Sequence, residues 1–526
     1  MTEGNREVRE LPKGWSLVSI SDVCLVMSGQ TPKGVDSNIS SDGEIPWFRV
    51  GNMNEPGNER ALRFTDIRLT QERANSLGLH VRPENTIVFP KRGGAIATNK
   101  KRFLGQPSAY DLNLMGIFPV GFNIQYFWYW FQTVDLKRFS DGSNVPQINH
   151  GDIEPLLFPL APLFEQSRIV EKVEELFSDI DYGIKSLKTA QKQLKVYRHA
   201  VLKWAFDGNL TEAWRTQQST LKTGEALLTQ IKAERENRDR QQVAEWEMAV
   251  KEWEAIEKVG KKPTKPQKPK ELPPFTGAEL CELSKLPNEW CAAKIDFICD
   301  VVRGASPRPA GNPKYFGGEI PWIVVGDLTK DENTYLTKVT NFVTEEGREQ
   351  SRFIEPETLL LTNSGATLGV PKIIKIGGCI NDGSVAFLNL NENMKLYLYW
   401  FLKSQTLKLR GINQGAAQPN LNTTIVGNIV VPVTALEEQE QIVQEIESRL
   451  SICDQLEATI LENLQKAEAL RQSILKQAFE GKLVPQDPND EPAETLLDRI
   501  KAERQVNGNT GKKSKSSHQQ LTLQEL

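Results

Sequence analysis

Two long segments of the chain carry a mainly apolar stripe at alternating steps of four and three positions. The first stripe runs from Ile169 to Val201 and the second from Ile442 to Ile474, so each advances 32 residues (201 − 169 and 474 − 442). A sustained seven-residue apolar repeat is typical of an amphipathic helix that packs against a partner helix. At about 1.5 Å per residue, each stripe would span roughly 48 Å. The pattern therefore predicts two long helices of equal length.

Local signals mark the ends of both predicted helices. Pro162 suits a first helical turn, and Thr434 with Glu437 has the spacing of a capping box. Gly208 and Gly481 close the matching segments KWAFDG and KQAFEG, and a glycine there can take the left-handed conformation that caps a helix. We expect the helices to pack antiparallel as a coiled coil. The alternative is that each helix only covers its own domain.

Most of the sequence outside these helices consists of short apolar runs, and these runs are duplicated. Glycine-rich turns follow two of them, Thr86–Phe89 and Thr358–Leu361. The matched motifs, in chain order, are LPKGW at 11–15 with LPNEW at 286–290, GEIPW at 43–47 and again at 318–322, KRGGAIA at 91–97 with NSGATLG at 363–369, and GSNVPQIN at 142–149 with GAAQPNLN at 415–422. Internal repeats indicate that one structural unit is used twice.

The repeats and the helices together predict an α+β chain with a pseudo-twofold internal repeat, in which two similar globular domains are separated by two long helices. The predicted segments are an N-terminal tail (1–10), a first globular domain (11–161), a first long helix (162–208), a charged helical insert with a Pro/Lys linker (209–285), a second globular domain (286–433), a second long helix (434–481), and a C-terminal helix with a polar tail (482–526).

Composition narrows the class of protein. The formal net charge is −4, so any positive surface for nucleic acid must be local. No window approaches the roughly 18 apolar residues of a membrane span, and the N-terminus has no signal-like apolar region, so a cytoplasmic protein without membrane contact is expected. The six cysteines and four histidines lack the spacing of zinc ligands, and no metal site is predicted.

No catalytic motif is found. The sequence has no phosphate-binding G-x-x-x-x-G-K-[ST] loop, no HExxH, no GxSxG and no dinucleotide fingerprint after a strand. Pro83, Glu84 and Lys91 loosely resemble a nuclease cluster, but the second repeat has Asn363 in place of the lysine. We therefore expect a protein that is not itself an enzyme.

Candidate DNA-binding residues lie in the two repeated glycine-rich and amide-rich loops. Lysine and arginine can contact phosphates, and amides and arginine can read base edges. The alternative is that the loop amides only stabilise turns. In the first repeat the candidates are Lys91, Arg92, Gly93, Lys100, Lys101, Arg102, Asn144, Gln147 and Asn149. In the second they are Asn363, Ser364, Thr367, Lys372, Lys375, Gln418, Asn420 and Asn422. Replacing Arg92 or Lys101 by alanine is expected to weaken DNA binding and flatten its salt dependence.

The duplication continues beyond the long helices. The sequence IKAER occurs at 231–235 and at 500–504. Equivalent surfaces bind equivalent subunits, so Lys232, Arg235, Lys501 and Arg504 are candidates for docking two copies of one partner. Solvated helical faces are the alternative.

Taken together, these motifs resemble the specificity subunit of type I restriction–modification systems across roughly residues 11–500. The Glu165-Gln166 and Glu438-Gln439 pairs after each strand and proline, and the AFDG and AFEG helix ends, also carry the resemblance. It implies two target-recognition domains, each reading half of an asymmetric, bipartite site in double-stranded DNA. It also implies two methyltransferase subunits that use S-adenosylmethionine, motor-nuclease subunits that use ATP and Mg, and no cofactor in this subunit. A coiled-coil adaptor that binds proteins at both ends is the alternative function.

If the helices set the distance between half-sites, deleting one heptad from both helices changes the spacer and leaves each half-site sequence unchanged. Mapping methylated sites in genomic DNA measures both quantities. An unaltered spacer would refute this role of the helices.

Overall fold

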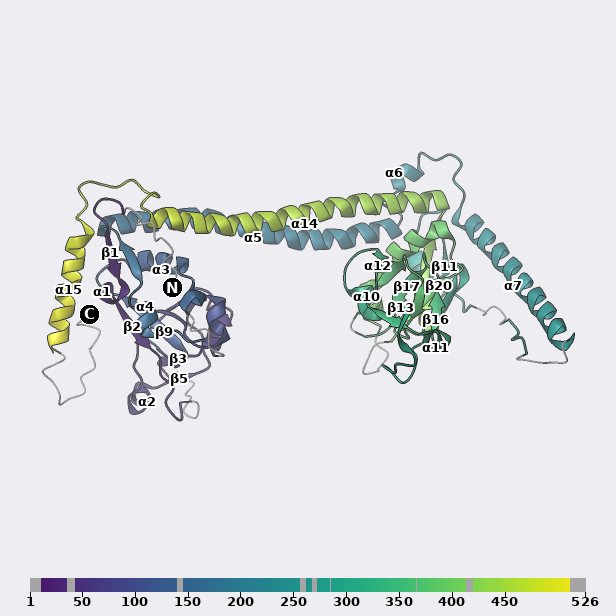
Figure 1. Ribbon diagram of the computed structural model, residues 1–526. Helices are drawn as coiled ribbons and strands as arrows, with labels where there is room; N and C mark the ends of the chain where they lie inside the picture. Colours follow the sequence, from purple (N-terminus) through teal and green to yellow (C-terminus); the bar gives the residue numbers. More distant parts are fainter. Residues whose placement is uncertain are drawn as a thin grey trace. The chain divides into compact units, whose positions relative to one another are not determined.

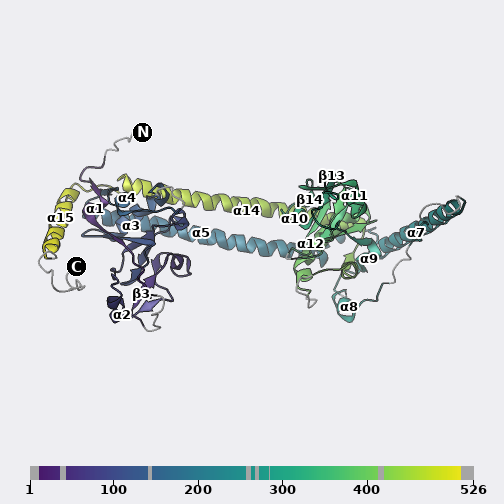
Figure 2. The same cartoon turned by 60° about the horizontal axis from the view of Figure 1, so that its bottom comes forward.

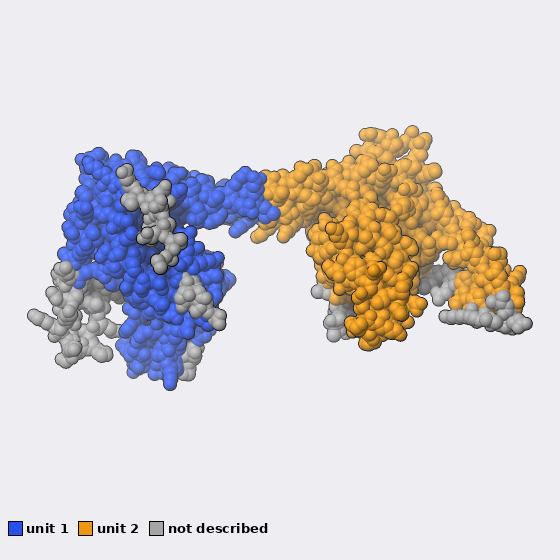
Figure 3. Space-filling view, viewed as in Figure 1, with its two compact units in different colours: residues 1–188, 461–526 blue, residues 189–460 orange. Residues whose placement is uncertain are grey.

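The computed structural model describes residues 11–35, 43–139, 145–255, 262–266, 272–283, 285–365, 367–412 and 420–510, with side chains as far as residue 504. The described chain forms two units, which are coloured separately in Figure 3. Unit 1 contains residues 1–188 and 461–526, and unit 2 contains residues 189–460. Each unit therefore takes one part of both long helices.

Unit 1 is built on a five-stranded sheet in the order β2-β9-β6-β7-β4, with a three-stranded sheet β5-β3-β8 and a two-stranded sheet β1-β10. The three-stranded sheet and α2 lie at the end away from the long helices (Figures 1 and 2). The elements are β1 (Ser16–Ser19), α1 (Ile20–Val23), β2 (Cys24–Ser28), β3 (Ile45–Phe48), η1 (Val50–Asn54), β4 (Ala61–Leu62), β5 (Arg68–Leu69), α2 (Gln71–Ser76), β6 (Ile87–Pro90), η2 (Gly94–Thr98), β7 (Arg102–Leu104), β8 (Ala109–Tyr110), β9 (Leu114–Pro119), α3 (Ile124–Thr133), η3 (Leu136–Phe139), α4 (His150–Ile153), β10 (Leu157–Leu160), the first part of α5 (Leu163–Phe206), the last part of α14 (Leu436–Phe479) and α15 (Ala493–Thr510).

Unit 2 repeats this plan. Its sheets have the orders β12-β20-β17-β18-β14, β15-β13-β19-β16 and β11-β21. The elements are α6 (Glu212–Arg215), α7 (Gly224–Ala255), α8 (Gly277–Leu283), β11 (Cys291–Lys294), α9 (Ile295–Ile298), β12 (Asp300–Arg303), β13 (Phe316–Ile323), α10 (Val325–Thr329), β14 (Tyr335–Leu336), β15 (Asn341–Val343), α11 (Glu345–Glu349), β16 (Arg352–Ile354), β17 (Leu359–Thr362), β18 (Pro371–Ile374), β19 (Gly378–Ile380), β20 (Ser384–Leu388), η4 (Glu392–Met394), α12 (Lys395–Arg410), α13 (Thr423–Gly427) and β21 (Val430–Val433). It also holds the remaining parts of α5 and α14.

Aromatic helices form the core of each unit. In unit 1, α3 packs between the five-stranded sheet, α5 and α14, and all six residues from Tyr126 to Phe131 are buried. The Tyr126 hydroxyl donates to the Pro159 carbonyl at 2.9 Å, and in unit 2 the Tyr397 hydroxyl donates to the Pro432 carbonyl at 2.8 Å. The equivalent Cys24 and Cys299 are also buried. The duplication in the sequence is thus a duplication of internal contacts.

The tryptophan of each LPxxW motif is held by the glutamate that begins the following long helix. Trp15 Nε1 donates to Glu165 Oε2 at 3.0 Å in unit 1, and Trp290 Nε1 donates to Glu438 Oε2 at 2.9 Å in unit 2. Both carboxylates are almost fully buried. We call these contacts the Trp–Glu clamps.

The two clamps differ in how well the buried carboxylate is satisfied. Glu438 also accepts from the Thr434 hydroxyl at 2.6 Å, from the Thr211 hydroxyl at 2.8 Å and from Arg215 Nε at 2.8 Å. In unit 1, Glu165 Oε1 has no hydrogen-bond partner among the described residues, and burial raises the pKa of this carboxyl. The clamp in unit 2 is therefore the better satisfied one.

Each LPxxW motif also contacts the glycine that ends one of the long helices. Gly208 has φ +79° and lies against Pro287, and Gly481 has φ +67° and lies against Pro12. A Cβ at Gly481 would stand 2.1 Å from the Pro12 ring, so only glycine fits there without a shift. These glycines cap the helices and leave room for the proline.

The helices α5 and α14 lie side by side in both units and are each 44 residues long. Cross-helix ion pairs join Arg471 to Asp181 in unit 1, and Arg198 to Asp454 and Glu457 in unit 2. Because the start of α5 pairs with the end of α14 in unit 1, the helices run antiparallel.

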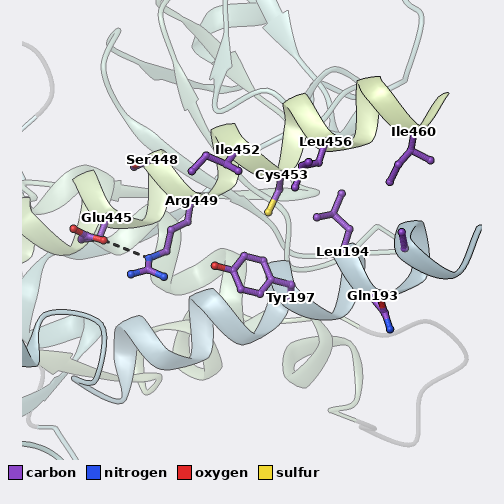
Figure 4. A pocket seen from close by; sticks show the side chains of 11 residues that line it. Gln193, Leu194, Tyr197, Glu445, Ser448, Arg449, Ile452, Cys453, Leu456 and Ile460 are labelled. Atoms are coloured by element: carbon purple, nitrogen blue, oxygen red, sulfur yellow. Dashed lines mark hydrogen bonds and ion pairs between the residues drawn. The ribbon is translucent and has the colours of Figure 1, made fainter. Parts of the chain in front are cut away.

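In unit 2 the apolar stripe of these helices is only partly covered. A groove of about 750 Å³ runs between them, and Tyr197 of α5 points toward Arg449 of α14 across it (Figure 4). Arg449 Nε also donates to Glu445 Oε2 at 3.3 Å. Tyr197 and Leu456, both members of the predicted stripe, are 44% and 49% exposed.

Replacing Glu438 with alanine should lower the free energy of unfolding by about 3–5 kcal/mol, because Arg215 and three further donors lose a buried acceptor. Replacing Glu165 with alanine removes one hydrogen bond and should cost about 1–3 kcal/mol. Urea unfolding of the full chain, followed by tryptophan fluorescence, compares the two variants. Equal losses would contradict the stated asymmetry of the clamps.

Candidate nucleic-acid interface

In unit 1 the glycine-rich turn after β6 and the amide-rich loop before α4 form one continuous surface. The Ile148 amide donates to the Lys91 carbonyl at 2.8 Å, and the Gly93 amide donates to the Pro146 carbonyl at 2.7 Å. Arg92 and Gln147 face each other as an isolated β-bridge. Two motifs that are about 50 residues apart in the sequence are therefore joined by backbone hydrogen bonds.

The turn itself depends on glycine and faces open space. Gly93 has φ +72° and ψ −168°, a conformation that side chains rarely adopt. Among the described residues, nothing lies within 4 Å of the position that a Cβ would take at Gly93 or Gly94. A ligand can therefore approach the turn closely.

Lys91 and Arg92 place two neighbouring cations at this turn. Arg92 is exposed and Lys91 is half-buried. Burial and the adjacent Arg92 lower the pKa of the Lys91 ammonium. Within the described part of the chain, the side-chain hydrogen bond of Lys91 goes to the uncharged Ser28 hydroxyl.

Lys91 also belongs to a chain of side chains that the sequence did not single out. Its Nζ donates to Ser28 Oγ at 3.0 Å, and Ser28 Oγ lies 3.0 Å from His150 Nε2. His150 Nδ1 lies 3.1 Å from Glu154 Oε1. The only hint in the sequence is position. Ser28 precedes a Gly-x-Thr/Ser-Pro turn at 29–32 that is repeated at 304–307, and His150 follows the amide-rich loop.

The other three basic candidates of unit 1 bind the domain itself. Lys101 is 1% exposed, donates to the Val134 carbonyl at 2.7 Å and to Asn99 Oδ1 at 3.1 Å, and its burial lowers its pKa to about 8. Arg102 donates to the backbone carbonyls of Lys101 and Met53, and Lys100 donates to the side chain of Asn54. The Lys101 side chain therefore lies inside the domain and is not accessible to DNA, unlike the contact expected from the sequence.

Unit 2 contains the same junction of loops with different side chains. The Leu421 amide donates to the Asn363 carbonyl at 2.7 Å, and Ser364 forms an isolated β-bridge with Asn420. The Asn363 side chain is fully buried, and neither of its amide atoms has a hydrogen-bond partner among the described residues. Thr367 lies in the same turn and accepts a hydrogen bond from Thr362 through its backbone carbonyl.

Two loop amides have local structural roles. Asn149 Oδ1 accepts from Gln147 Nε2 at 2.9 Å, and Asn422 Oδ1 accepts from the Ile425 amide at 2.8 Å as the cap of α13. Asn149 and Asn422 nevertheless remain exposed at the surface. The candidates Asn144 and Gln418 lie outside the described residues.

The lysine candidates of unit 2 anchor neighbouring loops. Lys372 is 1% exposed, and its Nζ donates to Asp331 Oδ1 at 2.7 Å and to the Asp331 carbonyl at 3.0 Å. Lys372 occupies the position that Arg102 has in unit 1. Arg102 pairs with Val88, the second residue of β6, and Lys372 pairs with Leu360, the second residue of the equivalent strand β17. Lys375 contacts Glu357 at 2.8 Å, and its hydrogen bond with that carboxylate raises its pKa.

The repeated Gly-x-Thr/Ser-Pro turn adds a second difference between the units. The hydroxyl of Thr31 accepts from the Leu112 amide at 3.1 Å, and the hydroxyl of Ser306 accepts from the Asp382 amide at 3.2 Å. The residue whose amide donates is Leu112 in unit 1 and the acidic Asp382 in unit 2. The Asp382 carboxylate lies 3.5 Å from the Arg308 guanidinium. The turn of unit 2 therefore carries an internal counter-charge.

The partner-docking candidates divide by residue type. Arg235 of α7 donates to the Phe297 carbonyl at 3.0 Å and to Asp300 at 2.9 Å, and Arg504 of α15 donates to the Ser21 carbonyl at 2.5 Å. Both arginines therefore fix their helices to their own unit. Lys232 and Lys501 are exposed.

Within the described residues, no helix is long and apolar enough to cross a bilayer. No group of three or more His, Cys, Asp or Glu side chains in that part of the chain is arranged to hold a metal ion.

The family model of the type I restriction modification DNA specificity domain matches residues 12–189 and 287–466. The type I restriction enzyme EcoDI specificity subunit of Escherichia coli is 23% identical over 523 residues, which cover 96% of this chain and 98% of that protein. The StySPI specificity subunit of Salmonella potsdam is also 23% identical, over 533 residues that cover 96% and 98% of the two chains.

Two solved structures share the fold. One is from a study of complex assembly and conformational transition of the type I R-M system, with a TM-score of 0.60, 17% identity, and coverage of 90% of this chain and 99% of that chain. The other is the HsdS subunit of Thermoanaerobacter tengcongensis, with a TM-score of 0.50 and the same identity and coverage. The predicted α+β fold with two similar domains and two long packed helices is confirmed.

The fold and its duplicated loop surface define a two-domain recognition protein that is not the catalytic part of its system. The chain belongs to the family of type I restriction–modification DNA specificity subunits.

Replacing Arg92 with alanine should weaken DNA binding and reduce the log–log salt slope by about one unit, which is the loss expected for one phosphate contact. The matched variant Lys101→Ala should leave the slope unchanged and lower stability, because its ammonium is buried. Binding titrations over a range of salt concentrations and thermal unfolding test both. A slope that falls for Lys101→Ala and not for Arg92→Ala would reverse the assignment.

Proposed function

We propose that this specificity subunit reads a bipartite, asymmetric site in double-stranded DNA, with one half-site for each unit. The two recognition domains would be residues 11–161 and 286–433. The supporting observation is that one junction of loops occurs twice with different chemistry, Lys91-Arg92 and Gln147 in unit 1 and Asn363-Ser364 and Asn420 in unit 2. A conserved frame with changed side chains is what two different half-sites require.

Within unit 1, the exposed Arg92 and the neighbouring Gln147 and Asn149 are the proposed DNA contacts. Arginine can contact a phosphate, and an amide can bind adenine through two hydrogen bonds. Lys91 contributes positive charge toward the phosphates. Unit 2 offers Ser364, Thr367, Asn420 and Asn422 at the equivalent surface, with less positive charge.

The proposed role of α5 and α14 is to set the distance between the half-sites. Each is one unbroken helix of 44 residues, and side-chain ion pairs join the two helices in both units. A pair of continuous helices joined by ion pairs keeps a fixed end-to-end distance better than a flexible linker does.

We also propose that the subunit directs two methyltransferase subunits and the motor-nuclease subunits to this site. S-adenosylmethionine, ATP and Mg would be bound by those partners. Support comes from membership of the family and from the equivalent seating of α7 and α15, where Arg235 and Arg504 fix two matching helices that present Lys232 and Lys501. Two equivalent surfaces suit two copies of one partner.

Expressing the chain with its cognate methyltransferase should produce genomic methylation at a two-part motif, and omitting the chain should abolish it. Gln147→Ala should relax the sequence requirement in one half only, and Asn420→Ala in the other half only. Single-molecule sequencing of methylated DNA measures both effects. Absence of sequence-specific methylation, with the partner still bound, would favour the protein-adaptor function instead.

A further inference from the structure

Four side chains from three segments of unit 1 form one hydrogen-bonded row that ends at the glycine-rich turn after β6. His150 begins α4 and Glu154 follows its last residue, Ser28 ends β2, and Lys91 follows β6. The successive distances are 3.1 Å from Glu154 to His150, 3.0 Å from His150 to Ser28, and 3.0 Å from Ser28 to Lys91. We call this row the Lys91 network.

The donors and acceptors of the network fit in one direction. If His150 Nδ1–H donates to the Glu154 carboxylate, Nε2 carries a lone pair and acts as an acceptor. The Ser28 hydroxyl then donates its hydrogen to Nε2 and keeps its own lone pairs for Lys91 Nζ, which can only donate. Each group therefore fixes the next, and the last group fixed is the ammonium.

The network orients a cation without neutralising it. The Ser28 hydroxyl is uncharged. The Glu154 carboxylate is bound to His150, so that Ser28 and His150 separate it from Lys91 in the row. Arg92 lies beside Lys91, and the turn faces open space at Gly93 and Gly94. In unit 2, by contrast, Glu357 lies directly against Lys375 and supplies its counter-charge.

The second unit lacks every member of this network. The matching positions hold Asn363 for Lys91, Arg303 for Ser28 (28 + 275), Thr423 for His150 (150 + 273) and Gly427 for Glu154 (154 + 273). Arg303 donates instead to the Asp382 carbonyl at 2.8 Å. The network is therefore a property of one recognition surface and not of the shared fold.

We propose that Ser28, His150 and Glu154 are positioning residues that aim the Lys91 ammonium at a DNA phosphate, and that only the half-site read by unit 1 depends on them. This inference rests on the proposed function of the two units. It adds that the units differ in kind, because unit 1 grips the backbone with an oriented cation and unit 2 presents amides and a hydroxyl at the same place.

The test uses the full chain assembled with its methyltransferase partner and duplexes that carry the mapped site intact or with one half scrambled. Lys91→Met should lower the log–log salt slope by about one unit, or roughly 0.9 for one phosphate. His150→Phe should produce nearly the same loss with lysine still present. The double variant Lys91→Met/His150→Phe should bind no more weakly than Lys91→Met alone, because His150 acts only through Lys91.

Conservative replacements provide the controls. Ser28→Thr keeps the hydroxyl and Glu154→Gln keeps an acceptor, so both should retain the slope, whereas Ser28→Ala and Glu154→Leu should lose it. Duplexes in which the unit 1 half-site is scrambled should bind the wild type and the network variants equally. Thermal unfolding of each variant identifies any that fail to fold.

Three outcomes would overturn the inference. They are an unchanged salt slope in Lys91→Met, full additivity in the double variant, or a loss of binding in the network variants that is the same whichever half-site is scrambled. If the wild-type complex shows no sequence-specific binding, the proposed function itself is wrong. If the wild type binds its site and the network variants bind it equally well, the proposed function stands and only the positioning role is wrong.

Discussion

The buried hydrogen bond from the LPxxW tryptophan to the first-turn glutamate of the following helix is the contact on which each unit depends. It joins the beginning of a domain to the beginning of the helix that leaves it, across 150 residues in unit 1 and 148 in unit 2. The neighbouring proline meets the glycine that ends the other long helix. A buried carboxylate needs such donors, because an unpaired charge in the interior costs several kcal/mol. The motif thus connects three separate segments in one place.

The frame and the recognition loops are constrained by different interactions. The five-stranded sheets have equivalent strand orders, and their aromatic helices are anchored by equivalent tyrosine hydrogen bonds. The loops at the glycine-rich turn share backbone hydrogen bonds but not side chains. Because the backbone holds the loops together, the side chains can change without loss of the fold. That separation allows two surfaces with different chemistry on one architecture.

Periodicity and repetition made the fold predictable. The heptad stripes indicated α5 and α14, and the apolar runs before each glycine-rich turn indicated β6 and β17. The direction of a side chain has no such periodic signal. Lys101 and Arg92 look equally available in the sequence, yet Lys101 turns inward to the Val134 carbonyl and Arg92 remains exposed. Ser28, Lys91 and His150 are separated by 63 and 59 positions, so their proximity follows only from the strand order.

The division of the chain between the units has a consequence for synthesis on the ribosome. Unit 2 is one continuous stretch, residues 189–460, whereas unit 1 needs residues from both ends of the chain, including the hydrogen bond from the Ala493 amide to the Gly14 carbonyl. Long-range contacts form late, because the intervening chain must first be made and its loop closed. Unit 2 can therefore fold while translation continues. Most residues of unit 1 are synthesised first, but the unit is completed last. The side chains of Ile169 and Val173 stay uncovered until the segment that carries Ile474 and Leu475 has been made.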